Sequence, residues 1–241
     1  MSADFSYALL RSELSALLAA GYRSIRCVDY IEHKKGPSSA EKVLVLRVDV
    51  DLSLAKAAPL LDIFAQLGIK ATFFVRLHAP EYNPFSFEGY RLLRRMVEEG
   101  HELGYHSEVV DEATIWREDA AACLRRDLAV LGAIAGVPIL GAASHNGLTG
   151  SNNLDFFKEN DHRSFGLLYE GYDRGPEYNL FHESRYVSDS EWTRWKAYDQ
   201  GIRMENDFRP PSGHLADQPR VLHLLIHTDT FYQSHFYERE R

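Results

Sequence analysis

Two aspartates, Asp49 and Asp51, end the apolar run KVLVLRVDVDL, which begins at Lys42. A continuous apolar run followed by a helical pattern is typical of a buried parallel strand, which is covered on both faces. Side chains at positions i and i+2 of a strand point to the same face, so these carboxylates would project together. Two like charges that close favour one raised pKa or a bound cation. The pair therefore predicts a site; the alternative is that one aspartate caps the helix starting near Ser53 while the other pairs with Arg47.

Other predicted strands also end in residues that can do chemistry. These residues are His106 with Glu108, His145 with Asn146, His227 with Asp229, and Arg76 with His78. In parallel α/β folds, ligands bind where the carboxyl ends of the strands meet. A single histidine in such a place is more often a core or surface residue, but agreement among several strand ends favours a site.

Carboxylate and imidazole side chains together suit zinc or a similar divalent ion that keeps one coordination position open for water. Such an ion polarises a carbonyl and acidifies water, a nearby carboxylate can take the proton, and an imidazole can protonate the leaving group. The sequence contains no G-x-S-x-G elbow, no phosphate-cradling glycine loop and no C-x-x-C pair. These patterns together predict a metal-dependent hydrolase.

The elements that must position these residues alternate along the chain. Apolar periodicity and glycine stops predict helices at 5–18, 54–67, 87–99, 112–135 and 153–159. Apolar and β-branched runs predict strands at 24–31, 42–52, 70–77, 101–106, 138–144, 164–169, 185–187 and 220–227. This alternation predicts an α/β fold with a parallel sheet and outer helices, either an open doubly wound sheet or a closed barrel. No repeat or linker interrupts it, so we expect residues 1–241 to form a single domain.

Composition narrows the possible partners and location. A formal net charge of −8 argues against nucleic acid or an anionic membrane surface as the main partner. The first 21 residues carry acids and an arginine within their apolar pattern, which predicts neither a signal peptide nor a membrane-spanning helix. We therefore expect a cytoplasmic protein without membrane insertion. Cys27 and Cys123 fit buried reduced thiols better than a disulfide framework.

The chain resembles the polysaccharide deacetylase (NodB-homology, carbohydrate esterase) family in four short motifs whose order and spacing are more specific than any one of them. The motifs are R-V-D-V-D at 47–51, A-T-F-F at 71–74, G-H-E-L-G-Y-H at 100–106 and L-L-I-H at 224–227. The resemblance runs from about Val43 to Tyr232 and leaves residues 1–42 as an N-terminal addition. It implies an irregular (β/α) barrel whose members remove N- or O-acyl groups from sugars with a divalent metal, commonly zinc.

Matched residue by residue, the resemblance implies that Asp49 is the general base and His227 the general acid. It also implies that Asp51 and His106 are metal ligands. The chain departs from the family pattern at Val110, where the family has a second metal histidine. The arginine and proline that the family has on the strand corresponding to 138–144 are also missing, and Ser144, His145, Asn146 and Gly147 stand in their place. We interpret these departures as a divergent subgroup.

A third metal ligand must then come from elsewhere, or the metal is weakly bound or absent. His145 is the first choice, because it follows a neighbouring strand and imidazole suits the same ions. Glu108 is the second choice and Asp111 the third; the alternative for both is a solvated turn and a cap for the following helix. We predict Asn146, next to His145, as a substrate-binding residue.

Several other residues each have a functional and a structural interpretation. Arg76, on a loop with Tyr82 and Asn83, can bind a substrate phosphate or carboxylate or form an ordinary ion pair. Trp192, Trp195 and Tyr198 form a sugar-stacking platform or part of the core. Asp173 orients His227 or makes a turn.

The resulting hypothesis is a metal-dependent hydrolase that removes an N-acyl group, acetyl or formyl, from a sugar. A cytoplasmic location favours a nucleotide-linked or lipid-linked saccharide made for a surface polysaccharide such as an O-antigen. Two alternatives remain open, namely an amidohydrolase acting on a non-sugar amide and a catalytically inactive saccharide-binding relative. The sequence does not predict the oligomeric state.

Overall fold

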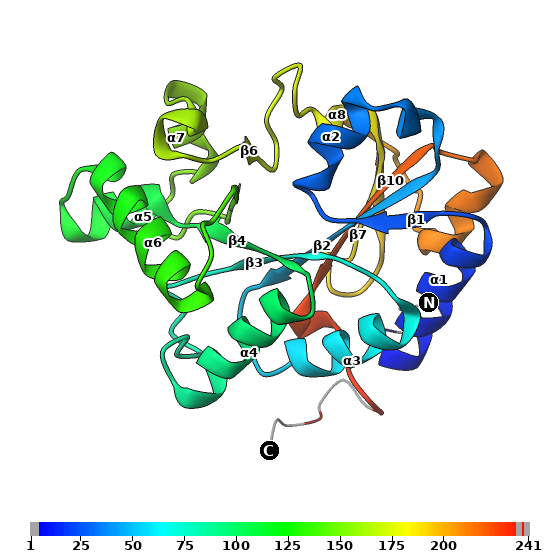
Figure 1. Ribbon diagram of the computed structural model, residues 1–241, viewed down its shortest axis with the longest axis horizontal. Coiled ribbons are helices and arrows are strands. Elements are labelled where there is room, and N and C mark those ends of the chain that lie inside the picture. Colours follow the sequence, from blue (N-terminus) through cyan, green and yellow to red (C-terminus); the bar gives the residue numbers. More distant parts are fainter. Residues whose placement is uncertain (1–4, 235–237, 239–241) are drawn as a thin grey trace.

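The computed structural model describes residues 5–234 and 238, which form a ten-stranded sheet with helices around it (Figure 1). The strands are β1 (Arg23–Ile25), β2 (Val43–Val50), β3 (Thr72–Val75), β4 (Glu102–Ser107), β5 (Gly141–Ser144), β6 (Tyr169–Glu170), β7 (Arg185–Ser188), β8 (Lys196–Asp199), β9 (Ile202–Arg203) and β10 (Val221–His227). The α-helices are α1 (Tyr7–Ala19), α2 (Asp29–Lys35), α3 (Ala57–Leu67), α4 (Phe87–Glu98), α5 (Val109–Trp116), α6 (Ala120–Ala135), α7 (Leu154–Glu159) and α8 (Leu180–Glu183). Short 3-10 helices are η1 (Pro37–Ala40), η2 (His162–Phe165), η3 (Pro211–Asp217) and η4 (Thr228–Thr230).

Strand β2 is central, and both of its edges are paired. The order of the sheet is β6-β5-β4-β3-β2-β10-β7-β8-β9, and β1 pairs with β2 beside this path. On one edge, residues 43–49 of β2 pair with β10, while on the other edge 43–45 pair with β1 and 47–50 with β3. All pairs from β6 to β7 are parallel, and β8 and β9 add an antiparallel edge. The predicted fold class, an irregular (β/α) barrel with mostly parallel strands, is confirmed.

The two faces of β2 have different neighbours because its side chains alternate. The residues at 44, 46, 48 and 50 join the large core with apolar residues of α1, α3, α4 and α6. Val43 and Val45 join a smaller core on the other face, and Arg47 and Asp49 follow them on that face. In Figure 1 the sheet crosses the centre, with α3 and α4 below it and α2 and α8 above it. The strand therefore delivers its charged residues away from the helix-covered core.

The predicted long helix at 112–135 is two helices. Helix α5 ends at Trp116, the next residue Arg117 has a φ of 58° in the left-handed region, and α6 begins after Asp119. The side chain of Asp119 accepts a hydrogen bond from the backbone N–H of Ala122, which is an N-cap arrangement. The expected continuous helix was wrong because this cap starts a new helix within an unbroken helical composition.

Three other sequence predictions of local structure also need correction. The predicted strand 24–31 ends at Ile25, and Asp29 begins helix α2, where its carboxylate accepts hydrogen bonds from the backbone and side chain of Arg26. Of the predicted strand 164–169, residues 164–165 end the 3-10 helix η2, residues 166–168 are in neither helix nor strand, and only Tyr169 belongs to β6. The short antiparallel strands β8 and β9 were not predicted.

The N-terminal segment packs onto the same sheet as the rest of the chain. Strand β1 pairs with β2, and α1 contributes Leu10, Leu14 and Leu17 to the large core. That residues 1–241 form one domain with 1–42 as an addition stays a prediction. Cys27 and Cys123 are buried free cysteines, as expected. Among the residues that the structure describes, none of the helices has the length and apolar composition to span a membrane.

Candidate metal centre and active site

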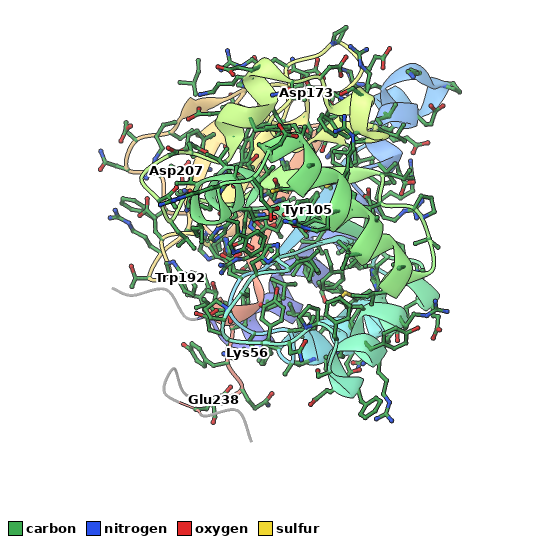
Figure 2. All side chains as sticks on the ribbon, turned by 90° about the vertical axis from the view of Figure 1, so that its left-hand side faces the viewer. Lys56, Tyr105, Asp173, Trp192, Asp207 and Glu238 are labelled. Atoms are coloured by element: carbon green, nitrogen blue, oxygen red, sulfur yellow. The ribbon has the colours of Figure 1, made fainter. Side chains whose placement is uncertain are left out.

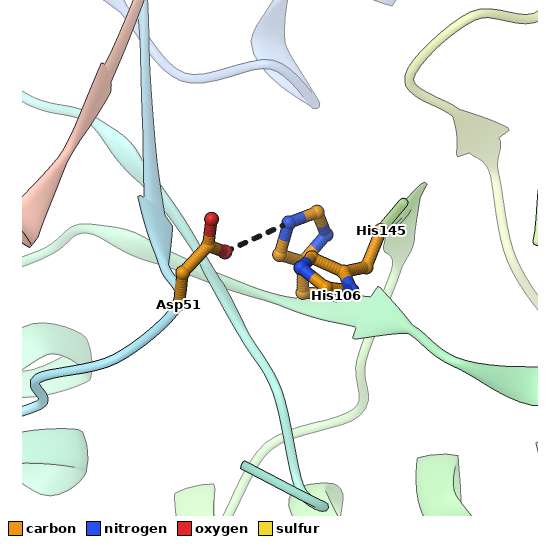
Figure 3. A group of neighbouring side chains, drawn as sticks. All are labelled: Asp51, His106 and His145. Atoms are coloured by element: carbon orange, nitrogen blue, oxygen red, sulfur yellow. Dashed lines mark ion pairs between the residues drawn. The ribbon is translucent and has the colours of Figure 1, made fainter. Parts of the chain in front are cut away.

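Three of the predicted ligands meet where β2, β4 and β5 end (Figure 3). We call Asp51, His106 and His145 the candidate metal triad. Each offers one ligand atom, and these atoms all lie within 4.8 Å of one another. His106 Nε2 lies 3.2 Å from Asp51 Oδ1. Ligand atoms around a tetrahedral zinc ion lie about 3.4 Å apart, so the spacing suits such an ion.

The triad also leaves buried polar atoms unsatisfied. His145 Nδ1 is buried without a hydrogen-bond partner among the described residues, and Asp51 Oδ1, also buried, makes no hydrogen bond there besides its 3.2 Å ion-pair contact with His106. Such atoms are rare in folded proteins, because burying a polar group without a partner is costly. A cation held by one oxygen and two nitrogen ligands would satisfy both atoms, and this donor set suits zinc or a similar divalent ion. The residues present therefore fit a divalent metal.

His106 is oriented by a neighbouring strand. Its Nδ1 lies 2.8 Å from the backbone carbonyl oxygen of Ala143 on β5, so Nδ1 donates and Nε2 points at the carboxylates. This is the usual outer hydrogen bond of a metal-binding histidine. Burial lowers the pKa of His106, but the charges of Asp49 and Asp51 outweigh burial and raise it. A bound cation would take the place of the imidazolium proton, so metal binding should release that proton.

His145 is held by a hydrogen-bond network that the sequence did not reveal. The side-chain amide of Asn153 donates to the backbone carbonyl of His145 at 3.1 Å and to Asp111 Oδ2 at 2.8 Å. Asp111 Oδ1 accepts the backbone N–H groups of Leu148 and Thr149. Asp111 thus shapes the loop after His145, and the side-chain oxygen of Asn153 accepts hydrogen bonds from the backbone N–H groups of Val110 and Asp111 in the first turn of α5. Burial, with a smaller effect of the His106 charge, lowers the pKa of His145 to about 4, which keeps it in its neutral, ligand form.

Asp49 is held by an arginine from its own strand. The Nε and one terminal nitrogen of Arg47 donate to its two oxygens at 2.8 and 2.7 Å. Both residues are buried, with 1% and 2% exposure, and the guanidinium carbon lies 5.1 Å from the ring centroid of Phe74 and 5.2 Å from that of Tyr172. Burial raises the pKa of Asp49, but the charges of Arg47 and His106 outweigh it, so the pKa is lowered. Arg47 thus supplies a buried guanidinium in a chain whose segment 138–147 has no arginine.

His227 lies on the other side of Asp51 and pairs with an unpredicted acid. Its Nδ1 donates to Asp189 Oδ1 at 2.6 Å, and its backbone N–H donates to Asp189 Oδ2 at 2.9 Å. Its Nε2 lies 3.8 Å from Asp51 Oδ2, and the Trp192 ring stacks on the imidazole at 6.0 Å between centroids. Burial lowers the pKa of His227, but Asp189 outweighs this and raises it to about 9. The imidazole is therefore protonated at neutral pH, which is the form of a general acid.

The acid expected to orient His227, Asp173, lies elsewhere. Its carboxylate accepts the backbone N–H of Gly175 and lies 3.8 Å from His162, which is the turn alternative. Figure 2 shows Asp173 well away from Trp192, which stacks on His227. The only signal for Asp189 in the sequence is that this acid directly follows the short strand β7.

The structure does not bring every predicted site residue into the candidate metal triad. Glu108 Oε1 accepts two hydrogen bonds from Arg76, at 2.9 and 2.7 Å, and Arg76 also donates to the backbone carbonyl of Asp51. Arg76 therefore has the ion pair that was the alternative to substrate binding. Asn146 is exposed beside His145, and its role in substrate binding stays a prediction. Asp229 accepts the backbone N–H of Leu52 and so fixes the turn after Asp51.

The aromatic cluster divides between the core and the site. Trp195 is 2% exposed and packs on Phe5 at 5.2 Å between centroids. Tyr198 packs on Phe181 and Tyr186. Trp192 is 40% exposed and covers His227. The platform interpretation therefore fits Trp192 alone.

A second histidine and carboxylate cluster lies outside the site. His78 Nε2 is 2.9 Å from Asp127 and 3.2 Å from Glu112. The hydroxyl of Tyr105 lies within hydrogen-bond distance of both carboxylates, and Arg126 donates to Glu112. Because these groups already bind one another, the cluster is an ion-pair network. It raises the pKa of His78 to about 10 in spite of burial, through hydrogen bonds to Asp127 and Glu112.

A group of side chains that could hold a metal, flanked by a carboxylate and an imidazole at the carboxyl ends of parallel strands, is the layout of a hydrolase site. The sequence profile of the polysaccharide deacetylase family matches residues 37–222. This match covers more than half of the chain, and the chain therefore belongs to the polysaccharide deacetylase family. The family deacetylates saccharides and generally uses a divalent metal.

Solved structures of CE4 proteins resemble the chain at low identity. A CE4 esterase from Streptococcus mutans is 18% identical, with a TM-score of 0.52 and coverage of 88% of this chain and 82% of that one. The CE4 domain of a multidomain xylanase from the hindgut metagenome of Trinervitermes trinervoides is 24% identical, with a TM-score of 0.34 and coverage of 43% and 48%. A CE4 pseudoenzyme from Bacillus anthracis is 15% identical, with a TM-score of 0.47 and coverage of 79% and 57%.

The esterase supports the fold alone at this identity. The chain spans about half of the length of the xylanase domain and less than two thirds of the pseudoenzyme. A search of curated proteins found no match.

Proposed function

We propose that this protein is a divalent-metal-dependent carbohydrate deacylase that removes an N-acyl group, acetyl or formyl, from a sugar. The observation that carries the proposal is the convergence of the candidate metal triad with a base and an acid. Asp49 Oδ2 lies 3.3 Å from His106 Nε2, and His227 Nε2 lies 3.8 Å from Asp51 on the other side. The ion that we propose is zinc, held by Asp51, His106 and His145.

Each group then has one task. A divalent ion supplies Lewis acidity toward the amide carbonyl and lowers the pKa of the attacking water. Asp49 accepts the proton of that water, because Arg47 keeps it ionised while each carboxylate oxygen retains a free lone pair. His227 donates a proton to the leaving amine, because Asp189 keeps the imidazole charged. Arg47 thus keeps Asp49 deprotonated and able to accept a proton, whereas Asp189 keeps His227 protonated and able to donate one.

The substrate we propose is an amide-bearing sugar on a nucleotide or lipid carrier, used inside the cell for a surface polysaccharide. Sugar identity follows from neither the metal triad nor the acid and base, because these groups act on the acyl group. The proposal on metal and chemistry is therefore tested apart from the sugar.

The test is metal analysis of the purified chain after chelation and after zinc is added back. Wild type should take up a stoichiometric amount of zinc and then release acetate or formate from some of a panel of N-acyl sugars. Asp49→Asn should keep the metal and lose turnover, whereas Asp51→Asn should weaken metal binding itself. Failure of wild type to bind stoichiometric metal would overturn the mechanism, and equal loss of metal in both variants would overturn the division between base and ligand.

Turnover separates the alternatives once metal binding is known. A metal-loaded chain that hydrolyses simple amides but no N-acyl sugar is a non-sugar amidohydrolase. A chain that binds saccharide without releasing acid is an inactive relative.

A further inference from the structure

A cleft of about 560 Å³ lies between α7 and the residues that follow β6. We call it the α7 cleft; in Figure 1, α7 and α8 lie on two sides of the connection after β6. Three aromatic side chains line it, namely Phe157, Tyr172 and Phe181. Nitrogen-bearing side chains also line it, namely Lys158, His162, Arg174 and His182. Ring surfaces beside cationic groups suit a sugar or base that carries phosphate.

The α7 cleft shares its wall with the active site. The Tyr172 ring lies 5.2 Å from the Arg47 guanidinium carbon, and Arg47 binds Asp49. Glu170, buried at the cleft, accepts hydrogen bonds from the backbone N–H and the hydroxyl of Ser144, the residue before His145. One end of the cleft is therefore fixed to both the proposed base and a proposed metal ligand.

The acids of the α7 cleft are already engaged, whereas its arginine is not. Glu170 binds Ser144 and the backbone N–H of Tyr172, and Asp173 accepts the backbone N–H of Gly175. Arg174 forms no ion pair with a carboxylate among the described residues, and its Nε donates to Nε2 of His182 at 3.1 Å. Its planar fork of terminal N–H groups remains for an anion, and such a fork matches phosphate oxygens in pairs. In a chain with a net charge of −8, an unpaired arginine in a cleft favours an anionic ligand.

We propose that the α7 cleft binds the phosphate of a carrier-linked N-acyl sugar, with Arg174 on the phosphate and the sugar passing Tyr172 toward the candidate metal triad. This inference rests on the proposed function and names its substrate class, a sugar esterified to phosphate at the anomeric carbon. The chemistry is shared by nucleotide-linked and lipid-linked sugars. The aromatic rings would contact the sugar or, in a nucleotide, the base.

The experiment compares N-acetylhexosamine 1-phosphates with the methyl glycosides of the same sugars. For wild type, kcat/KM should be at least about tenfold higher with the phosphate, because hydrogen bonds from a guanidinium to a charged phosphate are stronger than those between neutral groups. Arg174→Gln should raise KM for the phosphate by a similar factor, with kcat unchanged, and leave the methyl glycoside unaffected. The control is Arg163→Gln, because Arg163 is exposed and already bound to Asp161.

Two further arms identify the carrier. If a nucleoside diphosphate sugar has a lower KM than the sugar 1-phosphate, the aromatic rings of the α7 cleft contact the base. If a polyprenyl diphosphate sugar has the lower KM, the rings contact the lipid. Either result supports the inference. Equal kcat/KM for phosphate and methyl glycoside, unchanged in Arg174→Gln, overturns the inference and leaves the proposed function standing.

Binding separates failure of the inference from failure of the proposed function. If no N-acyl sugar is hydrolysed, titration calorimetry with the sugar 1-phosphate still tests the α7 cleft. Binding that is lost in Arg174→Gln and kept in Arg163→Gln supports the phosphate site in an inactive protein. Absence of binding to wild type overturns it.

Discussion

Arg47 and Asp49 lie two residues apart on β2, and two parallel hydrogen bonds of 2.8 and 2.7 Å join the guanidinium to the carboxylate. Because i and i+2 side chains share a face of a strand, one strand supplies both the proposed base and its counterion. Both residues are buried, so removal of either partner leaves a charge without compensation.

Replacement of Arg47 by glutamine should move the acidic limb of the pH profile. Arg47 helps to hold the pKa of Asp49 below its usual value, so this pKa should rise in Arg47→Gln. As pH is lowered, the loss of kcat/KM should therefore begin at a higher pH in the variant than in wild type. The free energy of unfolding should drop by about 3–5 kcal/mol, as for other broken buried pairs. Arg23→Gln is the control, because its ion pair with Glu41 is exposed and should contribute less than about 1 kcal/mol. An unmoved acidic limb would contradict a positioning role for Arg47.

Replacement of Asp189 by asparagine should move the basic limb. The general acid must be protonated, and Asp189 raises the pKa of His227 to about 9, so wild-type activity should fall as pH rises through about 9. In Asp189→Asn this pKa drops, and the fall should begin at lower pH. His227→Gln should be inactive across the range. If Asp189→Asn keeps the wild-type basic limb, another group is the acid.

The third metal ligand can be assigned by comparing His145→Ala with Glu108→Gln. His145→Ala should weaken zinc binding by at least about tenfold, measured by competition with a chelator dye, because it removes a ligand atom of the candidate metal triad. Glu108→Gln should keep zinc and lower the melting temperature, because Arg76 loses a buried carboxylate. The reverse pattern would show that Glu108 binds the metal.

The cluster around His78 should make stability depend on pH. The pKa of His78 rises from an ordinary value near 6.5 to about 10 in the folded chain, so folding favours its charged form. This stabilisation is fully present below pH ~6.5 and is lost as pH rises through about 10. The difference in free energy of unfolding between wild type and His78→Gln, measured by urea denaturation, should be largest near pH 6 and vanish above pH 10. A constant difference across this range would contradict the ion-pair role.

The sequence predicted the end of the sheet at which the site lies, because alternation along β2 and the position of histidines at strand ends are local patterns. The coming together of Asp51, His106 and His145 follows from strands that are parallel and close in order. Asp189 could not be paired with His227 in the same way. Their contact depends on the pairing of β10 with β7, which brings together residues that are 38 positions apart in the sequence. No local sequence pattern predicts this pairing.

Loops were the other limit of sequence analysis. The loop after His145 is fixed by Asp111 and Asn153, which lie 42 positions apart. Their residue types suggested only caps and turns, since both side chains commonly bond to nearby backbone. The break between α5 and α6 similarly contains no glycine or proline and places Arg117 in a left-handed conformation.

The pairing of β2 on both edges has a consequence for amide hydrogen exchange. Residues 43–49 are bonded to β10, and β1 and β3 together cover most of the opposite edge. Opening β2 therefore requires the sheet to separate, so its amides should exchange only through unfolding of the whole fold, at the slow end of the chain's range. The carboxylate that follows this strand, Asp51, is thus anchored to the part of the backbone that opens least often.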